Sequence, residues 1–394
     1  MKDATLRAWW WYRQGLDGSM RGKSPAAILE RAGWSRSVGG VGPYLTLFSR
    51  GGTSREEADR AVAALEIHEL PAARGCTYVI PASDFGLGLA VGRGFGDDMK
   101  VALKLGVTGK EIDKLCDAVL RALENGPLDP DGIREATGKA SRNLGEAGKK
   151  KGLTTTLPVA LGRLQSEGRI RRVPVNGRLD QQRYRYVLWN PSPAVEPPSG
   201  DGFTELARHF FRWIGPATLG EFQWFAGLGV KAARQVIESL GLVPLTPGSD
   251  RLLMRDDAAT LAEFEPPSSP QYALVSSLDP ITANRREMQS LIDELDRART
   301  VMVDAAAKPL GGLADLPSHA ILDRGQIIGL WEYDVDTESI VWATFSRKPD
   351  KALRNAVEAT ETFVREQLGD ARSFSLDSPK SRAPRVEALR RMTR

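Results

Sequence analysis

One short stretch between Gly33 and Gly39 carries side chains that could do chemistry, namely Ser35, Arg36 and Ser37. A serine hydroxyl can hold a water molecule for attack on a carbon centre, whereas the Arg36 guanidinium suits a phosphate contact. Serines in such positions also commonly bond the local backbone of a loop or a helix cap. Both interpretations of the two serines stay open at the level of sequence.

His68 and Glu69 form a second candidate pair, because imidazole and carboxylate groups are common general bases. They end the stretch REEADRAVAALEIHEL, just before Pro71. Ser54 and Glu57 form a capping-box pattern that predicts a helix over this stretch. We therefore expect the pair at a helix end, where a solvated structural role competes with a catalytic one.

The clearest charge signal is a basic segment from Arg134 to Trp189. It holds 13 Lys or Arg against four Asp or Glu, a net +9, although the whole chain carries only +4. The rest of the chain is therefore acidic. Such asymmetry indicates one face that binds a polyanion, with a solvated basic surface as the alternative.

Within this segment the pattern predicts a helix ending at Gly168, then two strands around Asn176-Gly177, a strong hairpin signal. Two helices followed by a β-hairpin wing are the winged-helix plan, whose usual partner is double-stranded DNA. One of Gln181 and Gln182 could read a base edge, because side chains of a strand alternate between its faces. The residues predicted to contact DNA are Arg36, Lys149, Lys150, Lys151, Arg171, Arg172, Arg178, Gln181, Gln182, Arg183 and Arg185.

Helix, helix and strand patterns recur before and after this segment. Boundaries are indicated by the proline-rich stretches at 190–202 and 265–270. HAILDRGQIIGLWEYD and SIVWATFSR predict antiparallel strands, followed by a helix that packs on them and a loose basic tail. The predicted fold class is α+β with tandem winged-helix domains and a small C-terminal β-structure. The predicted domains are 1–98, 99–190 with the basic wing, 203–265 and 271–394.

Composition excludes several classes of protein. The two cysteines, Cys76 and Cys116, argue against a disulfide scaffold and a cysteine-based zinc site, and the three histidines are well separated. Cys116 lies on the apolar face of a predicted helix, so we expect it in a core. No apolar run reaches membrane-spanning length, and the N-terminal stretch does not resemble a signal peptide. We expect a cytoplasmic, nucleoid-associated bacterial monomer without metal or cofactor.

Several segments, in order along most of the chain, resemble the AlkZ/YcaQ family of alkylpurine DNA glycosylases. They are YLTLFSR, RGCTYVIPASDF, RWIGPATLGEFQWFAGL, SSLDP and ILDRGQIIGLWEYD. The resemblance implies three tandem winged helices and a C-terminal β-barrel, arranged as a concave channel for duplex DNA. It also implies metal-free hydrolysis of alkylated or crosslinked purine nucleosides.

One departure from the family pattern concerns the chemistry. Active members carry Gln-x-Gln or Gln-x-Asp just upstream of the YLTLFSR-like segment, where this chain reads Gly-Trp-Ser-Arg-Ser-Val. Such groups stabilise an oxocarbenium-like sugar and position a water molecule, whereas serine is shorter and Arg36 would repel a cationic alkylpurine. Two hypotheses follow: an active glycosylase variant using Ser35, Ser37, His68 or Glu69, and a catalytically silent DNA-binding protein. A transcription regulator is a third.

Overall fold

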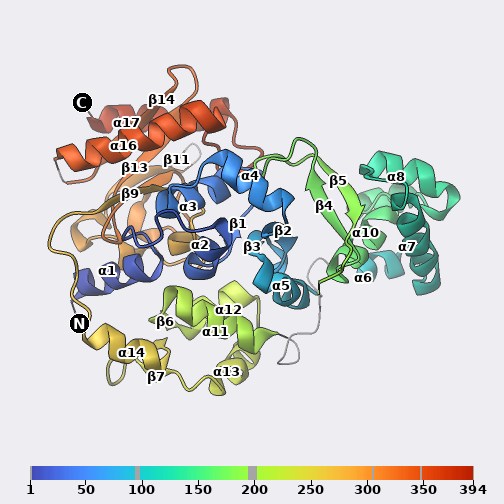
Figure 1. Ribbon diagram of the computed structural model, residues 1–394, viewed down its shortest axis with the longest axis horizontal. Coiled ribbons are helices and arrows are strands. Elements are labelled where there is room, and N and C mark those ends of the chain that lie inside the picture. Colours follow the sequence, from blue (N-terminus) through green and yellow to red (C-terminus); the bar gives the residue numbers. More distant parts are fainter. Residues whose placement is uncertain (1, 94–97, 194–201, 304–305, 347, 394) are drawn as a thin grey trace.

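The computed structural model describes residues 2–93, 98–193, 202–303, 306–346 and 348–393. Helices and short antiparallel strands alternate along the chain, which confirms the expected mixed composition (Figure 1). The boundary predicted at 190–202 lies, over residues 194–201, outside the described residues. Within the described ranges, no helix is long and apolar enough to cross a membrane.

The first part of the chain builds a three-stranded sheet in the order β1-β3-β2, with helices around it. Ser24 caps the second helix, and Ser54 with Glu57 forms the predicted capping box. Its elements are α1 (Asp3–Arg13), α2 (Pro25–Ala32), β1 (Ser35–Arg36), α3 (Gly42–Gly51), α4 (Arg55–Ala63), β2 (Ile67–Pro71), β3 (Thr77–Pro81) and α5 (Phe85–Gly92).

The predicted position of His68 and Glu69 at a helix end is wrong. Helix α4 ends at Ala63, and Leu65 takes a left-handed backbone with φ of 57° that turns the chain. The following residues pair with β3 as strand β2, so that both side chains lie buried in a sheet. The β-branched Ile67 and the pairing with β3 favour a strand over the helix that local pattern alone predicts.

The second part has a core of its own. The predicted helix face of Ile112, Leu115, Cys116, Val119 and Leu123 is buried, which confirms Cys116 as a core residue. The elements are α6 (Asp98–Lys104), α7 (Gly109–Leu123), α8 (Pro130–Thr137), α9 (Gly145–Lys150), α10 (Leu157–Ser166), β4 (Ile170–Pro174) and β5 (Tyr184–Leu188). Helices followed by a hairpin appear in the predicted order, while the assignment as a winged helix stays a prediction.

The hairpin connection is longer than the sequence predicts. Strand β5 begins only at Tyr184, so Gln181 and Gln182 lie in the loop 175–183 and not in a strand. The loop docks on the first part because Leu179 is buried in its core and donates its backbone N–H to Tyr44 Oη at 2.9 Å. We call residues 175–183 the wing loop.

The third part follows the same plan as the first two. Three helices precede its longest strand, and a short sheet has the order β6-β8-β7. The elements are α11 (Phe203–Ile214), β6 (Ala217–Thr218), α12 (Leu219–Ala226), α13 (Val230–Glu238), β7 (Val243–Pro244), β8 (Arg251–Leu253) and α14 (Arg255–Ala262). Its aromatic core is shared with the first part through Trp34, Tyr78 and Phe85.

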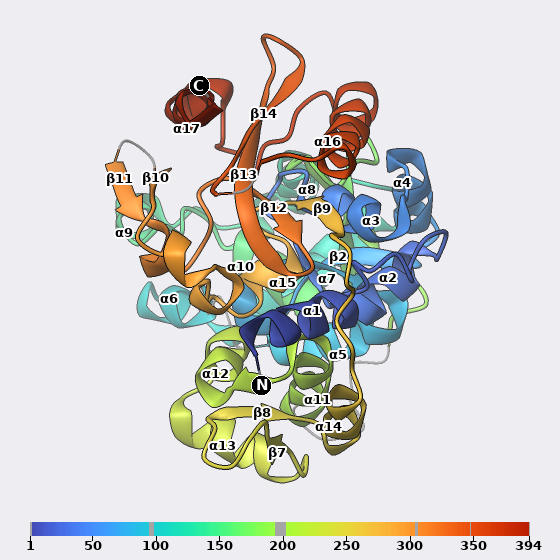
Figure 2. The same cartoon turned by 90° about the vertical axis from the view of Figure 1, so that its left-hand side faces the viewer.

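The C-terminal part is an open antiparallel sheet in the order β14-β13-β12-β9, and the expected closed barrel is not found among the described residues. Helices α16 and α17 lie on opposite sides of this sheet, so helices and not further strands cover it (Figure 2). The elements are β9 (Tyr272–Val275), α15 (Pro280–Ala283), β10 (Thr300–Val303), β11 (Ala306–Pro309), β12 (His319–Asp323), β13 (Gln326–Asp334), β14 (Ser339–Thr344), α16 (Lys351–Phe363) and α17 (Pro379–Thr393).

The basic tail is not loose, contrary to the prediction. It forms α17, in which Arg385 is buried and donates to Glu332 and Asp377 at 2.7 Å each. Leu389 on the same helix enters the core beneath the sheet. Two carboxylates that accept from one guanidinium explain how a basic helix packs against the protein, because they neutralise a charge that would be costly to bury alone.

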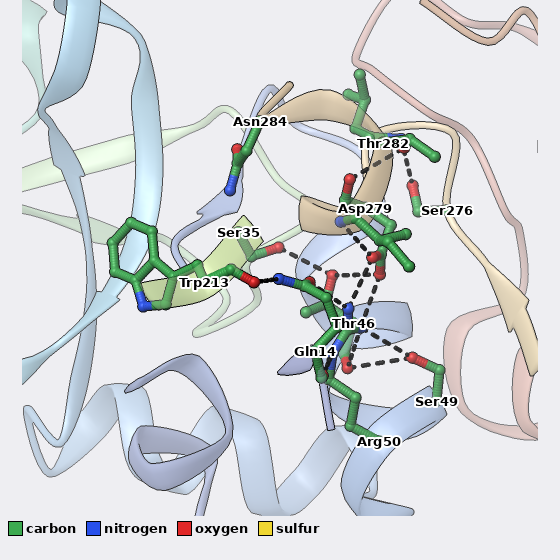
Figure 3. Close-up of polar contacts among 12 residues, drawn as sticks. Gln14, Ser35, Thr46, Ser49, Arg50, Trp213, Ser276, Asp279, Thr282 and Asn284 are labelled. Carbon is green, nitrogen blue, oxygen red and sulfur yellow. Dashed lines mark hydrogen bonds and ion pairs between the residues drawn. The ribbon is translucent and has the colours of Figure 1, made fainter. Parts of the chain in front are cut away.

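A buried ion pair ties the first part to the C-terminal part (Figure 3). Arg50 of α3 and Asp279 before α15 are both fully buried, and two guanidinium nitrogens donate to the two carboxylate oxygens at 2.8 Å. Gln14 accepts from Arg50 and donates to the backbone oxygen of Trp213 in α11. Residues of three segments singled out by sequence, YLTLFSR, SSLDP and RWIG, thus converge on one polar cluster that holds the parts together.

Candidate functional site

A cavity of about 460 Å³ lies where the first, third and C-terminal parts meet. Its wall is dominated by arginines and apolar side chains drawn from segments far apart in sequence. The lining residues are Arg36, Val38, Arg74, Trp224, Ser277, Leu278, Arg286, Val303, Asp315, Leu316, Pro317, Ser373, Phe374 and Arg385. We call this space the arginine cavity.

The indole of Trp224 lies close to two guanidinium groups of the cavity. The Arg74 guanidinium carbon lies 3.8 Å from the ring centroid of Trp224, and that of Arg286 lies 5.2 Å away. Both arginines have a left-handed backbone, with φ of 58° and 54°. Non-glycine residues seldom adopt this conformation, and where they do it commonly marks a functional site.

The arginines of the cavity differ in whether a carboxylate neutralises their charge. Arg385 is neutralised by its two buried carboxylate partners, and Arg286 lies 3.7 Å from Asp315. Asp315 contributes the one carboxylate among the described lining residues, and its side chain is 56% exposed. Arg36 forms no hydrogen bond or ion pair through its side chain with the described residues and stays available to a ligand.

The side chains between Gly33 and Gly39 fall into two groups, those that face the arginine cavity and those that point away from it. Arg36 and Val38 line the cavity, whereas Ser35 and Ser37 are buried and lie on the other side of the backbone. Ser35 donates to Thr46 Oγ1 at 3.1 Å, within the polar cluster of Arg50. The structure therefore places both serines in structural contacts and places their two neighbours at the cavity.

Glu69 lies in a buried polar cluster that joins the first part to the hairpin β4–β5. Ser37 donates to Glu69 Oε1 at 2.6 Å, and the Arg172 guanidinium lies 4.8 Å from the ring centroid of Tyr184. Burial raises the pKa of Glu69, while Arg172 and hydrogen bonds from Ser37 and Tyr184 oppose that rise. The arrangement fastens the hairpin and is separate from the arginine cavity.

His68 points away from Glu69, since consecutive residues of a strand face opposite sides. Its ring packs against Phe85 and Trp189, with centroids 6.1 and 5.3 Å apart. Burial lowers the pKa of His68 to about 3, with Arg171 and Arg172 adding to the effect. His68 is thus neutral at physiological pH and belongs to a core.

We expect His68 to make the protein less stable in acid. Its pKa is about 3 in the folded chain, against an ordinary value of 6.5, so between these values the unfolded chain binds one more proton. The free energy of unfolding then falls on acidification by about 1.4 kcal/mol per pH unit for this group. Urea unfolding of His68→Gln from pH 6.5 to 4 should show a slope smaller by that amount.

The matched control is Phe85→Leu, because it changes a neighbour of the His68 ring in the same core without removing a titratable group. It should keep the slope of the parent protein. An identical slope in the parent and in His68→Gln would contradict the assignment of His68 as a neutral core histidine.

The residues predicted to contact DNA divide by exposure. Arg178 is held by Asp180 in the wing loop and donates to the backbone oxygen of Leu368. Those that are half-buried are Arg36, Arg171, Arg172, Arg178 and Gln181. Those that are exposed are Lys149, Lys150, Lys151, Gln182, Arg183 and Arg185.

Sequence reasoning missed most of the cavity. Arg74 and Trp224 lie in two of the segments that resemble the family, but the sequence did not mark them as site residues. Arg286 and Asp315 lie in none of these segments, and the four side chains meet only in the folded chain. A tryptophan in the FQWFAG segment was the available signal, because a large aromatic beside apolar core residues can wall a cavity. Within the described ranges, no group of three or more His, Cys, Asp or Glu side chains is placed to hold a metal ion.

Comparisons with known proteins agree with one another. A family model described as "DNA glycosylase AlkZ-like" matches residues 41–368. The fold is similar to that of Streptomyces sahachiroi DNA glycosylase AlkZ, with a TM-score of 0.68 and 18% sequence identity over 94% of this chain and 98% of that chain. None of the curated proteins compared with the sequence matches it.

Proposed function

Because the chain belongs to the AlkZ-like DNA glycosylase family, we propose that it binds duplex DNA and hydrolyses the N-glycosidic bond of a damaged purine. The damaged base is alkylated or crosslinked, as in the family, and is turned out of the helix into the arginine cavity. The exposed basic side chains around the hairpin β4–β5 contact phosphates, and the three helix-and-hairpin parts act as winged helices.

The observation that carries the proposal is the wall of the arginine cavity. Its volume of about 460 Å³ falls in the range of small-molecule sites and accommodates one extruded nucleotide. Trp224, fixed by Arg74 and Arg286, offers an aromatic group beside which a base can be held. The Arg36 side chain has no partner among the described residues and is suited to a phosphate that flanks the extruded nucleotide.

Asp315 is the group best suited to the chemical step. As the N-glycosidic bond breaks, its electron pair leaves with the base and C1′ becomes an oxocarbenium-like centre. The Asp315 carboxylate stabilises that positive charge and accepts a proton from the water that attacks C1′. The products are the free base and an abasic site, and the reaction needs no other reactant.

Arg36 and Val38 have the spacing of the Gln-x-Gln or Gln-x-Asp pair of active family members. We propose that they occupy these positions, because both line the cavity upstream of the YLTLFSR segment. Neither side chain can orient a water molecule as glutamine does. This observation favours a second candidate function, a catalytically silent protein that binds damaged DNA through the same cavity.

A single-turnover excision assay distinguishes the two functions. The substrates are duplexes that each carry one alkylated purine, with and without a fixed positive charge, and one crosslinked duplex. Alkaline cleavage at the abasic site reports excision. A glycosylase releases base from at least one substrate, whereas tight binding without cleavage of any substrate establishes the silent protein.

DNA binding is expected to depend steeply on salt, because exposed lysines and arginines release counterions from phosphates. The logarithm of the affinity should fall linearly with that of the salt concentration, by about 0.9 per phosphate contact. Arg183, the last residue of the wing loop, and Arg185, in β5, are both exposed. Replacing each by alanine should reduce the slope by roughly one unit.

Fluorescence anisotropy of a labelled duplex at several salt concentrations measures this slope. Arg354→Ala on α16 is the control, since Arg354 is also exposed and lies far from the hairpin in sequence. A slope that does not change in the Arg183 and Arg185 variants would remove the hairpin from the DNA interface.

A further inference from the structure

An anchored loop beside the arginine cavity holds two apolar side chains out into solvent. In the segment 373–377, Phe374 is 43% exposed and Leu376 is 83% exposed, while Ser373 and Asp377 are buried. Phe374 also lines the cavity. Exposed and buried residues thus belong to one short loop, which we call the 373–377 loop.

The loop is fixed by hydrogen bonds at every buried position. Ser373 donates its backbone N–H to Asp377 Oδ2 at 3.0 Å, and Asp377 accepts from Arg385 at 2.7 Å through its other oxygen. Ser375 donates its backbone N–H to the oxygen of Val38 at 3.0 Å. The loop is therefore tied directly to the backbone of the cavity wall.

The neighbouring glycine shows how close this approach is. A Cβ atom added to Gly40 would lie 2.2 Å from the backbone oxygen of Ser373. Val41 donates its backbone N–H to the oxygen of Arg372 at 2.9 Å. The position of Phe374 and Leu376 relative to Arg36 and Val38 is thus set by backbone contacts.

We propose that Phe374 and Leu376 form a wedge that enters duplex DNA and fills the space left by the extruded base. This inference rests on the proposed function. Unstacking a base opens an apolar gap in the duplex, and rigid apolar side chains at the mouth of the receiving cavity can occupy it. Arg36 and Arg74 line the cavity without a carboxylate partner among the described residues and supply positive charge for the flanking phosphates. This charge favours DNA as the partner of the exposed apolar pair.

The test uses Phe374→Ala, Leu376→Ala and the double variant in the full-length protein. A duplex with 2-aminopurine at the target position reports extrusion, because its fluorescence rises when the base unstacks. The double variant should lose this signal on the fully paired duplex and bind it about 10- to 100-fold more weakly, the range of lost stacking contacts. A duplex in which the target base is already bulged needs no wedge, so binding there should stay within about threefold of the parent protein.

Two controls complete the design. Leu295→Ala changes a leucine that is 88% exposed outside this loop and should behave as the parent protein on both duplexes. Leu376→Met keeps an apolar side chain at this position and should retain most of the extrusion signal of the parent protein, unlike Leu376→Ala.

The outcomes separate the wedge from the proposed function. Parent-like extrusion and affinity in the double variant on the paired duplex overturn the wedge while the proposed function stands. An equal loss of affinity on paired and bulged duplexes also overturns it, because the loop then acts as a general contact. A parent protein that binds neither duplex overturns both proposals.

Discussion

Asp315→Asn is expected to slow single-turnover excision by about 10²- to 10³-fold, the usual cost of removing one electrostatic group from a transition state. Asparagine keeps the shape of the side chain but cannot stabilise a developing oxocarbenium charge or accept a proton from water. Asp315 is largely exposed, with its carboxylate 3.7 Å from Arg286. The substitution should therefore leave the fold and the affinity for DNA nearly unchanged.

The measurement compares excision rates at saturating protein with dissociation constants on the same damaged duplex. Asp117→Asn is the matched control, because Asp117 is exposed on α7 and does not line the arginine cavity. A rate for Asp315→Asn equal to that of the parent protein would exclude Asp315 from the chemical step. Weaker binding with an unchanged rate at saturation would assign it to positioning of Arg286.

The second large effect concerns stability. Asp279→Ala should lower the free energy of unfolding by about 3–5 kcal/mol, because it leaves the Arg50 charge buried without its partner. Both side chains are fully inaccessible to solvent, and the two short hydrogen bonds between them cannot be replaced by water. The variant should also loosen the junction between the first and C-terminal parts, since α15 loses its cap.

Chemical unfolding followed by tryptophan fluorescence measures this change. Glu56→Ala is the control, because it breaks the exposed ion pair of Glu56 with Arg60 and should cost less than about 1 kcal/mol. The double variant Arg50→Met with Asp279→Leu removes both charges and should recover much of the stability. A loss in Asp279→Ala no greater than that in Glu56→Ala would contradict the role of this pair.

Local structure is largely predictable from sequence, and the exceptions have physical causes. Caps and helix faces follow from short-range patterns, as for the Ser54–Glu57 box and the buried face of α7 that holds Cys116. Strand β2 has a helical local pattern, and only its tertiary pairing with β3 makes it a strand. Helix α17 has the composition of a loose tail, because the carboxylates that neutralise Arg385 lie elsewhere in the chain.

The candidate site is less accessible to sequence reasoning. The stretch around Arg36 stands out, but strand β1 has two residues, too few for an alternating pattern that tells which side chains face the cavity. Trp224, Arg286 and Asp315 come from different parts of the chain and reach the cavity through packing. The family resemblance predicts a mixed fold similar to that of AlkZ, but the closed barrel that it implies is not found among the described residues. A candidate for the water-orienting group emerges only from the geometry.

Helix α1 has a consequence for the order in which the chain acquires its structure during translation. Trp9, Trp10 and Trp11 are all buried in a core formed mostly with residues 253–389, and Arg7 donates to the backbone oxygen of Ile292, 285 positions away. As the chain leaves the ribosome, this helix emerges long before its partners exist. The three adjacent tryptophans of α1 therefore remain without most of their core partners until residues 253–389 have been synthesised, and the helix can pack fully only then.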